Sequence, residues 1–163
     1  MKFAGIFLLL TAGMLGGCAA ARQLDRRTAH IQTLRQLLTR MMNELRSSLP
    51  LTADLLRQTA AEPQFMQLDF LQRAAEHADC FPDCWAAALA ADRSLSPEEA
   101  AVLGTVGQTL GSMPLDGQLA ALQLCLEQLA VLQSDAEQCA RSKGRLYRSM
   151  GFLGAVFCAI LLI

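Results

Sequence analysis

The stretch IQTLRQLLTRMMNEL (residues 31–45) places apolar side chains at steps of three, four, three and four residues. These side chains are Ile31, Leu34, Leu38, Met41 and Leu45. An α-helix completes a turn in 3.6 residues, so this spacing gathers all five on one stripe of a helix. The stretch therefore predicts an amphipathic helix that turns one face toward a core.

Five prolines divide the region around this stretch into six segments: Pro50, Pro63, Pro82, Pro97 and Pro114. Proline is poorly tolerated inside helices and common at their starts. No segment alternates with a period of two, and β-branched residues are scarce, so strands are not expected. We predict one helix in each segment. The short connections favour antiparallel neighbours and hence a compact bundle.

The second, third and fourth segments supply most of the bulk that we expect in the core: Leu51, Leu55, Leu56, Phe65, Met66, Leu68, Phe70, Leu71, Cys84 and Trp85. The fifth segment opens with the clearest helix start in the chain. Ser96 can cap the free backbone N–H groups, Pro97 suits the first helical position, and Glu99 can reach back to the cap. This helix is expected to end at Gly111 and Pro114.

The sixth segment carries a long apolar stripe: Leu115, Leu119, Leu122, Leu126, Leu129 and Leu132. Leu124 and Val131 form a second apolar face. A helix that is apolar on two faces is predicted to be central in a bundle, with an outer docking stripe as the alternative. If it continues to the end of the chain, the helix from Asp116 to Ile163 measures about 70 Å, with Gly144 and Gly151 as weak points.

The apolar excess of the chain lies at its two ends. Hydrophobic residues make up 53% of the 163 residues and charged residues only 18%. Residues 3–21 form an uncharged run of 19 residues, and residues 149–163 form a second run of 15 residues. The second run is short for a helix that crosses a bilayer. The predicted fold is therefore all-α. A compact six-helix bundle (residues 22–148) is flanked by an N-terminal transmembrane helix (3–21) and a C-terminal transmembrane helix (149–163).

Basic residues gather on the bundle side of both uncharged runs: Arg22, Arg26, Arg27, Arg141, Lys143, Arg145 and Arg148. Cytoplasmic flanks of membrane spans collect Lys and Arg, so the central domain is predicted to be cytoplasmic. The net charge of the whole chain is −1, which gives no field to hold nucleic acid. We read the basic flanks as contacts to lipid headgroups.

The first uncharged run allows an alternative reading. Lys2, the apolar stretch and then Leu15-Gly16-Gly17-Cys18 resemble a lipoprotein signal with Cys18 as the lipidated residue. In that case the chain is an outward-facing helical binding module. The other five cysteines are Cys80, Cys84, Cys125, Cys139 and Cys158. None lies in a CxxC pair, so all six are interpreted as small buried hydrophobic residues in a reducing compartment.

No catalytic motif is found: there is no phosphate-binding loop, GxGxxG, GxSxG or HExxH. His77, Cys80 and Cys84 lie within eight residues, but a zinc site requires a fourth ligand and a recognised spacing. The acid pairs Asp79/Asp83 and Glu98/Glu99 are explained by the positive ends of helices. We therefore expect no enzyme, metal, cofactor or small-molecule substrate. An enzyme that used scattered acids would need a pocket of strongly perturbed carboxylates.

Contact with partner proteins is expected at exposed residues near the ends of the bundle. The candidates are four charged residues of the first helix: Arg35, Arg40, Glu44 and Arg46. A solvated helix face explains the same residues equally well.

Four motifs give the chain a resemblance to the stage III sporulation protein AB family of endospore-forming bacteria. They are ELRSSLPLTADLL (44–56), the Cys-Trp pair at 84–85, LGTVGQTLG (103–111) with Gln118 seven residues on, and KGRLYRSMGFLGAVFCAILLI (143–163). The resemblance covers nearly the whole chain. One departure is that Met113 and Pro114 stand where the family usually has a Ser-Asp pair.

The resemblance implies a function that composition does not. The family belongs to a channel-like assembly in the mother-cell membrane that faces the forespore, and its bundle is similar to the helical domains of type II secretion and type IV pilus platform proteins. Those platforms couple a cytoplasmic ATPase to membrane machinery. By analogy, the chain is expected to be a non-enzymatic membrane scaffold that docks the assembly's ATPase and its other membrane subunits.

Overall fold

The structure is a computed structural model that describes the backbone of residues 26–162 and the side chains of residues 26–139 and 142. The predicted N-terminal span, Arg22 and Cys18 lie outside the described residues. The chain divides into two units, Met1–His30 with Gln133–Ile163, and Ile31–Leu132. The second unit holds most of the predicted bundle.

Six α-helices and no strand occur in the described part of the chain, as the sequence predicted. A helix of residues 26–48, here called the 26–48 helix, comes first. The others are α2 (Thr52–Ala60), α3 (Asp69–Glu76), α4 (Asp83–Ala91), α5 (Pro97–Thr109) and α6 (Leu115–Leu162). Two single 3-10 turns separate the middle helices, η1 (Pro63–Phe65) and η2 (Ala78–Cys80).

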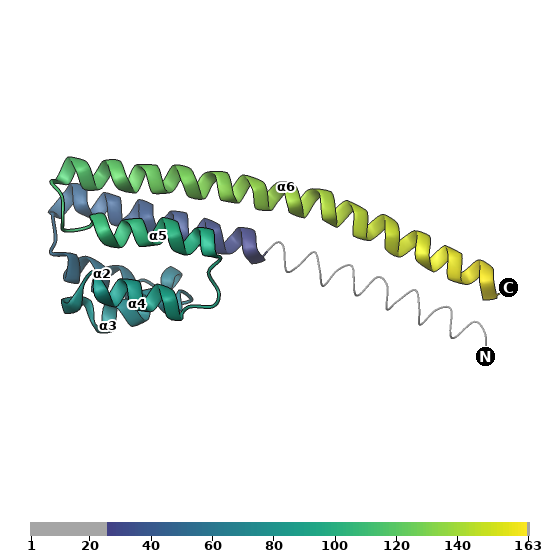
Figure 1. Ribbon diagram of the computed structural model, residues 1–163, viewed down its shortest axis with the longest axis horizontal. Helices are drawn as coiled ribbons and strands as arrows, with labels where there is room; N and C mark the ends of the chain where they lie inside the picture. Colours follow the sequence, from purple (N-terminus) through teal and green to yellow (C-terminus); the bar gives the residue numbers. More distant parts are fainter. Residues whose placement is uncertain (1–25, 163) are drawn as a thin grey trace. The chain divides into compact units, whose positions relative to one another are not determined.

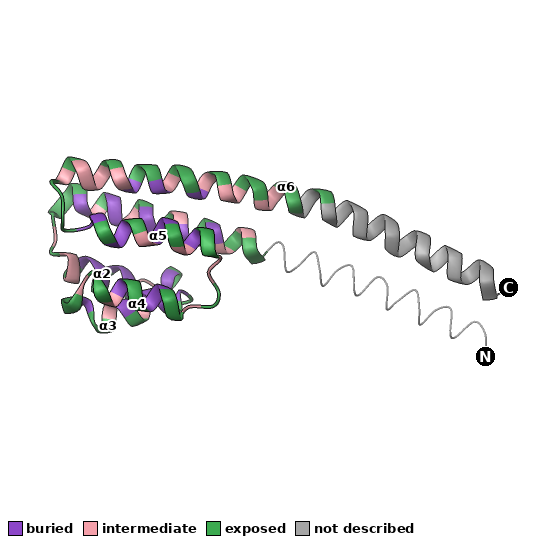
Figure 2. Cartoon of the chain, in the orientation of Figure 1, coloured by how far each residue is buried: buried purple, intermediate pink, exposed green. Residues whose placement is uncertain are grey.

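Within the Ile31–Leu132 unit, α2, α3 and α4 pack together on one side, while the 26–48 helix, α5 and the first part of α6 lie on the other (Figure 1). The two sides are joined where α4 packs on α5. Their buried faces meet in one core (Figure 2). Its largest fully buried side chains are Trp85, Phe65, Phe70, Ile31, Leu34, Leu37, Leu38, Met41, Leu55, Leu56, Leu68 and Leu71. The apolar stripe of residues 31–45 is therefore core, as predicted.

Trp85 is the residue that joins α4 to α5. Its indole is 1% exposed, and its Nε1–H donates to the Leu103 carbonyl oxygen at 2.8 Å. The ring meets Phe70 edge-on, with the ring centroids 5.4 Å apart. Gly107 on α5 lies directly against this indole, because a Cβ added there would be 2.4 Å from Trp85 Cδ1. The absence of a side chain at Gly107 is what lets α5 approach the ring.

The predicted start of α5 is confirmed in detail. The Ser96 hydroxyl accepts from the Glu99 N–H at 3.2 Å, and the Glu99 carboxylate accepts from the Ser96 N–H at 2.9 Å. Both halves of a capping box are therefore formed, and Glu99, only 2% exposed, has the Ser96 N–H as a donor to its carboxylate. The helix ends at Thr109, and Gly111 follows at φ +75°, where other residues are strained.

Replacing Ser96 with alanine is expected to lower the free energy of unfolding by about 1 kcal/mol, because the Glu99 N–H loses its acceptor. Thermal denaturation of the purified full chain, followed by circular dichroism, measures this loss. Thr105→Ala on the exposed face of the same helix is the control, and its effect should be near zero. An equal loss in both variants would contradict the capping role of Ser96.

Three details of the predicted fold are wrong. Pro63 opens a 3-10 turn, and the third helix begins six residues later at Asp69. Met66 and Leu51, expected in the core, are 65% and 75% exposed. The second apolar face of α6 is also open, since Leu124 and Val131 are 54% and 59% exposed. In the Ile31–Leu132 unit α6 is thus an outer helix and not a central one.

The sixth helix, for which breaks at Gly144 and Gly151 were considered, continues through both, since α6 runs from Leu115 to Leu162. No helix in the described part of the chain is both long and apolar enough to cross a bilayer. The cysteines differ from expectation: Cys125 is buried and Cys84 half-buried, but Cys80 and Cys139 are exposed. These four carry free thiols.

Candidate interaction surfaces

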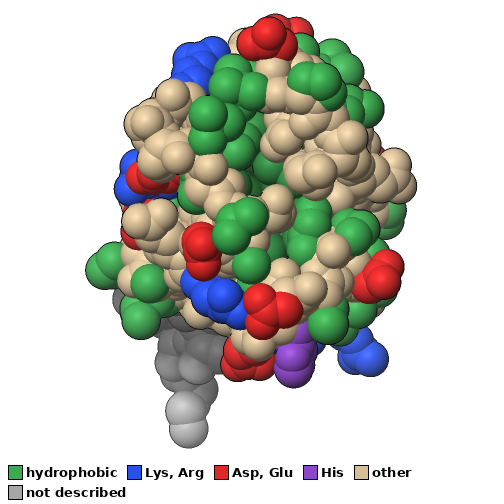
Figure 3. Space-filling model, turned by 90° about the vertical axis from the view of Figure 1, so that its left-hand side faces the viewer, with side chains coloured by type: hydrophobic (Ala, Val, Ile, Leu, Met, Phe, Trp, Pro, Cys, Tyr) green, Lys and Arg blue, Asp and Glu red, His purple; other side chains and the backbone are tan. Residues whose placement is uncertain are grey.

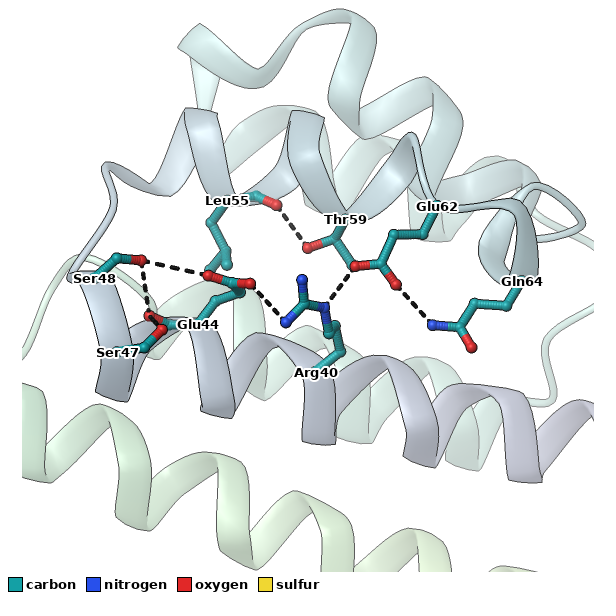
Figure 4. A network of polar contacts seen from close by, with 8 residues as sticks. All are labelled: Arg40, Glu44, Ser47, Ser48, Leu55, Thr59, Glu62 and Gln64. Carbon is teal, nitrogen blue, oxygen red and sulfur yellow. Dashed lines mark hydrogen bonds and ion pairs between the residues drawn. The ribbon is translucent and has the colours of Figure 1, made fainter.

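Arg40 is the centre of a polar network that links the 26–48 helix to the segment after α2 (Figure 4). Its guanidinium contacts the Glu44 carboxylate one turn along the same helix at 2.6 Å. Its Nε–H also donates to Glu62 Oε1 at 2.5 Å, across 22 residues of sequence. Gln64 donates to the other Glu62 oxygen at 2.7 Å. The network holds the turn after α2 against the first helix.

The charges in this network shift one another's ionisation. Partial burial raises the pKa of Glu62, but the hydrogen bonds from Arg40 and Gln64 and the charge of Arg40 outweigh it, so the pKa lies below its usual value. The hydrogen bond to Glu62 raises the pKa of Arg40 in turn. The ionised form of Glu62 is therefore the one that the folded chain stabilises.

Glu62→Gln is expected to reduce stability slightly at pH 7, and the difference from the unchanged chain should vanish in acid. The folded pKa of Glu62 is lowered, so its contribution is present above the unfolded value and is lost as the pH falls below about 4. Denaturation midpoints of both chains between pH 7 and pH 3 measure this. Gln64→Ala, which keeps the Arg40–Glu62 ion pair, is the control and should change less. If the difference between the two denaturation midpoints stays constant from pH 7 to pH 3, the stabilisation by Glu62 does not come from its charge.

The four predicted partner-contact residues have different surroundings. Arg40 and Glu44 are engaged within the chain, and the Glu44 side chain is only 14% exposed. Arg35 is half-buried, and Arg46 is exposed on the last turn of the helix. Arg46 is thus the one of the four that a partner reaches most easily. The contact between Arg40 and Glu44 could have been inferred from their spacing of four residues on one helix. The contact between Arg40 and Glu62 could not, because 22 residues separate them in the sequence.

Of the predicted membrane-flanking residues, Arg26 and Arg27 are exposed at the start of the 26–48 helix. Arg141, Lys143, Arg145 and Arg148 belong to α6, where only the backbone is described.

A second surface, which we call the apolar tip, consists of Leu49, Leu51 and Met113. Leu49 and Leu51 belong to the loop between the 26–48 helix and α2, and Met113 to the loop between α5 and α6. The loop after α5 lies against the first residue of α2, because a Cβ added to Gly111 would lie 2.9 Å from Thr52 Oγ1. All three apolar side chains are exposed, Leu51 most of all.

The two loops of the apolar tip lie together at the left-hand end of the bundle in Figure 1. Figure 3 faces this end of the unit and shows hydrophobic side chains in broad groups, with single acidic and basic side chains between and around them. Exposed apolar groups that gather in one place are typical of interaction surfaces.

The fold and these surfaces define a small all-α bundle protein whose polar clusters join its helices and whose exposed apolar residues gather at one end. Comparison with protein families gives the identity. The family described as stage III sporulation protein AB matches residues 2–163, and the chain belongs to this family. It is a stage III sporulation protein, as the sequence motifs predicted.

A solved structure of a stage III sporulation protein AB (SpoIIIAB) has a similar fold. The TM-score is 0.58 at 24% sequence identity, over 71% of this chain and 97% of that one. The comparison with curated proteins gave no significant match.

Proposed function

We propose that this chain is a non-enzymatic scaffold subunit of a membrane complex that acts in sporulation, and that its bundle docks a cytoplasmic ATPase and other membrane subunits. Membership of the stage III sporulation protein AB family carries the proposal. Channel formation between mother cell and forespore, and the similarity to secretion platforms, come from the family resemblance.

The proposed topology places uncharged spans at residues 3–21 and 149–163, with the bundle in the cytoplasm. The uncharged runs and their basic flanks support it. The polar clusters of the bundle support a structural role, since each joins one element to another. Arg40 joins the first helix to Glu62, and Arg57 joins α2 to Asp79 of η2 at 2.7 Å.

Thiol labelling in intact cells tests the topology. The variant to use keeps Cys80, which is exposed, and carries alanine at the other five cysteines. A membrane-impermeant thiol reagent should label it only after permeabilisation if the bundle is cytoplasmic. The matched control keeps only Cys125, which is buried, and should react only after denaturation. Labelling of Cys80 in intact cells would place the bundle outside and would overturn ATPase docking.

The lipoprotein alternative rests on Leu15-Gly16-Gly17-Cys18, which lies outside the described residues. The mass of the intact protein from cells decides it. A mass that corresponds to a chain beginning at a lipidated Cys18 would contradict the scaffold proposal. The chain would then be an outward-facing binding module. A chain that retains residues 3–21 would support the span. If both tests favour the cytoplasmic bundle, co-purification of the full chain with the ATPase of the same complex becomes the direct test of docking.

A further inference from the structure

We draw no further inference here: the strongest candidate, the apolar tip formed by the exposed side chains of Leu49, Leu51 and Met113 on the loops at one end of the bundle, carries none because nothing in the structure shows what covers it.

Discussion

Trp85→Ala is expected to lower the free energy of unfolding of the bundle by about 3–5 kcal/mol, the usual cost of removing a buried aromatic ring. The indole fills the junction of α3, α4 and α5, where it is 1% exposed and meets Phe70 and Phe81 edge-on. Alanine leaves a cavity there and removes the hydrogen bond to the Leu103 carbonyl. For a unit of this size the loss corresponds to a decrease in Tm of about 15 °C or more.

Circular dichroism of the purified full chain measures this loss, with Met66→Ala as the exposed control. Met66 is 65% exposed, so its truncation should change the Tm by little. Trp85→Phe should fall between the two, because it keeps an aromatic ring and loses the N–H donor. A Tm for Trp85→Ala within a few degrees of the unchanged chain would mean that the junction is not a stabilising core.

Gly107→Ala and Gly104→Ala are expected to change stability in opposite directions, although both lie on α5. A Cβ at Gly107 would be 2.4 Å from Trp85 Cδ1, so the ring or the helix must move, at a cost of about 1–3 kcal/mol. A Cβ at Gly104 meets nothing within 4 Å. That substitution should stabilise by about 0.5–1 kcal/mol, because alanine favours the helix more than glycine does.

The cause of the Gly107 effect can be isolated in a double-mutant cycle. In the Trp85→Ala background the ring is gone, so Gly107→Ala should lose its cost and become neutral or stabilising. The coupling free energy between the two positions should therefore exceed about 1 kcal/mol. Additive effects would show that Gly107 is constrained by something other than the indole. Gly104→Ala in the same background should keep its small gain.

The helical fold was predictable because its signals are local. The proline positions separate the helices, and the Ser96–Glu99 capping box depends on residues three apart. The beginning of α3 was missed because a proline suits a 3-10 turn as well as the first turn of an α-helix. Periodicity shows that a face is apolar but not that another helix covers it. This is why Leu124 and Met66 were assigned to the interior.

The candidate surfaces were less predictable because they depend on contacts between distant residues. In the sequence Arg40 looks like a surface charge of the first helix. Only the fold shows that Glu62, 22 residues later, lies beside it. The apolar tip did leave a signal in the sequence. The second helix was expected at Pro50, and leucines stand at 49 and 51 where a helix end and a helix start favour small or polar residues. Leu51 was instead assigned to the core because it is hydrophobic, and Leu49 was given no role.

The burial of Trp85 also provides an intrinsic fluorescence probe of folding. It is the one tryptophan in the whole chain, so all indole fluorescence comes from the junction of α4 and α5. A buried indole emits at shorter wavelength than one in water, and unfolding of the Ile31–Leu132 unit should shift the emission to the red. The rest of the chain contributes no indole signal. Folding of the bundle can therefore be followed optically in the complete protein, without a label and without cutting the chain.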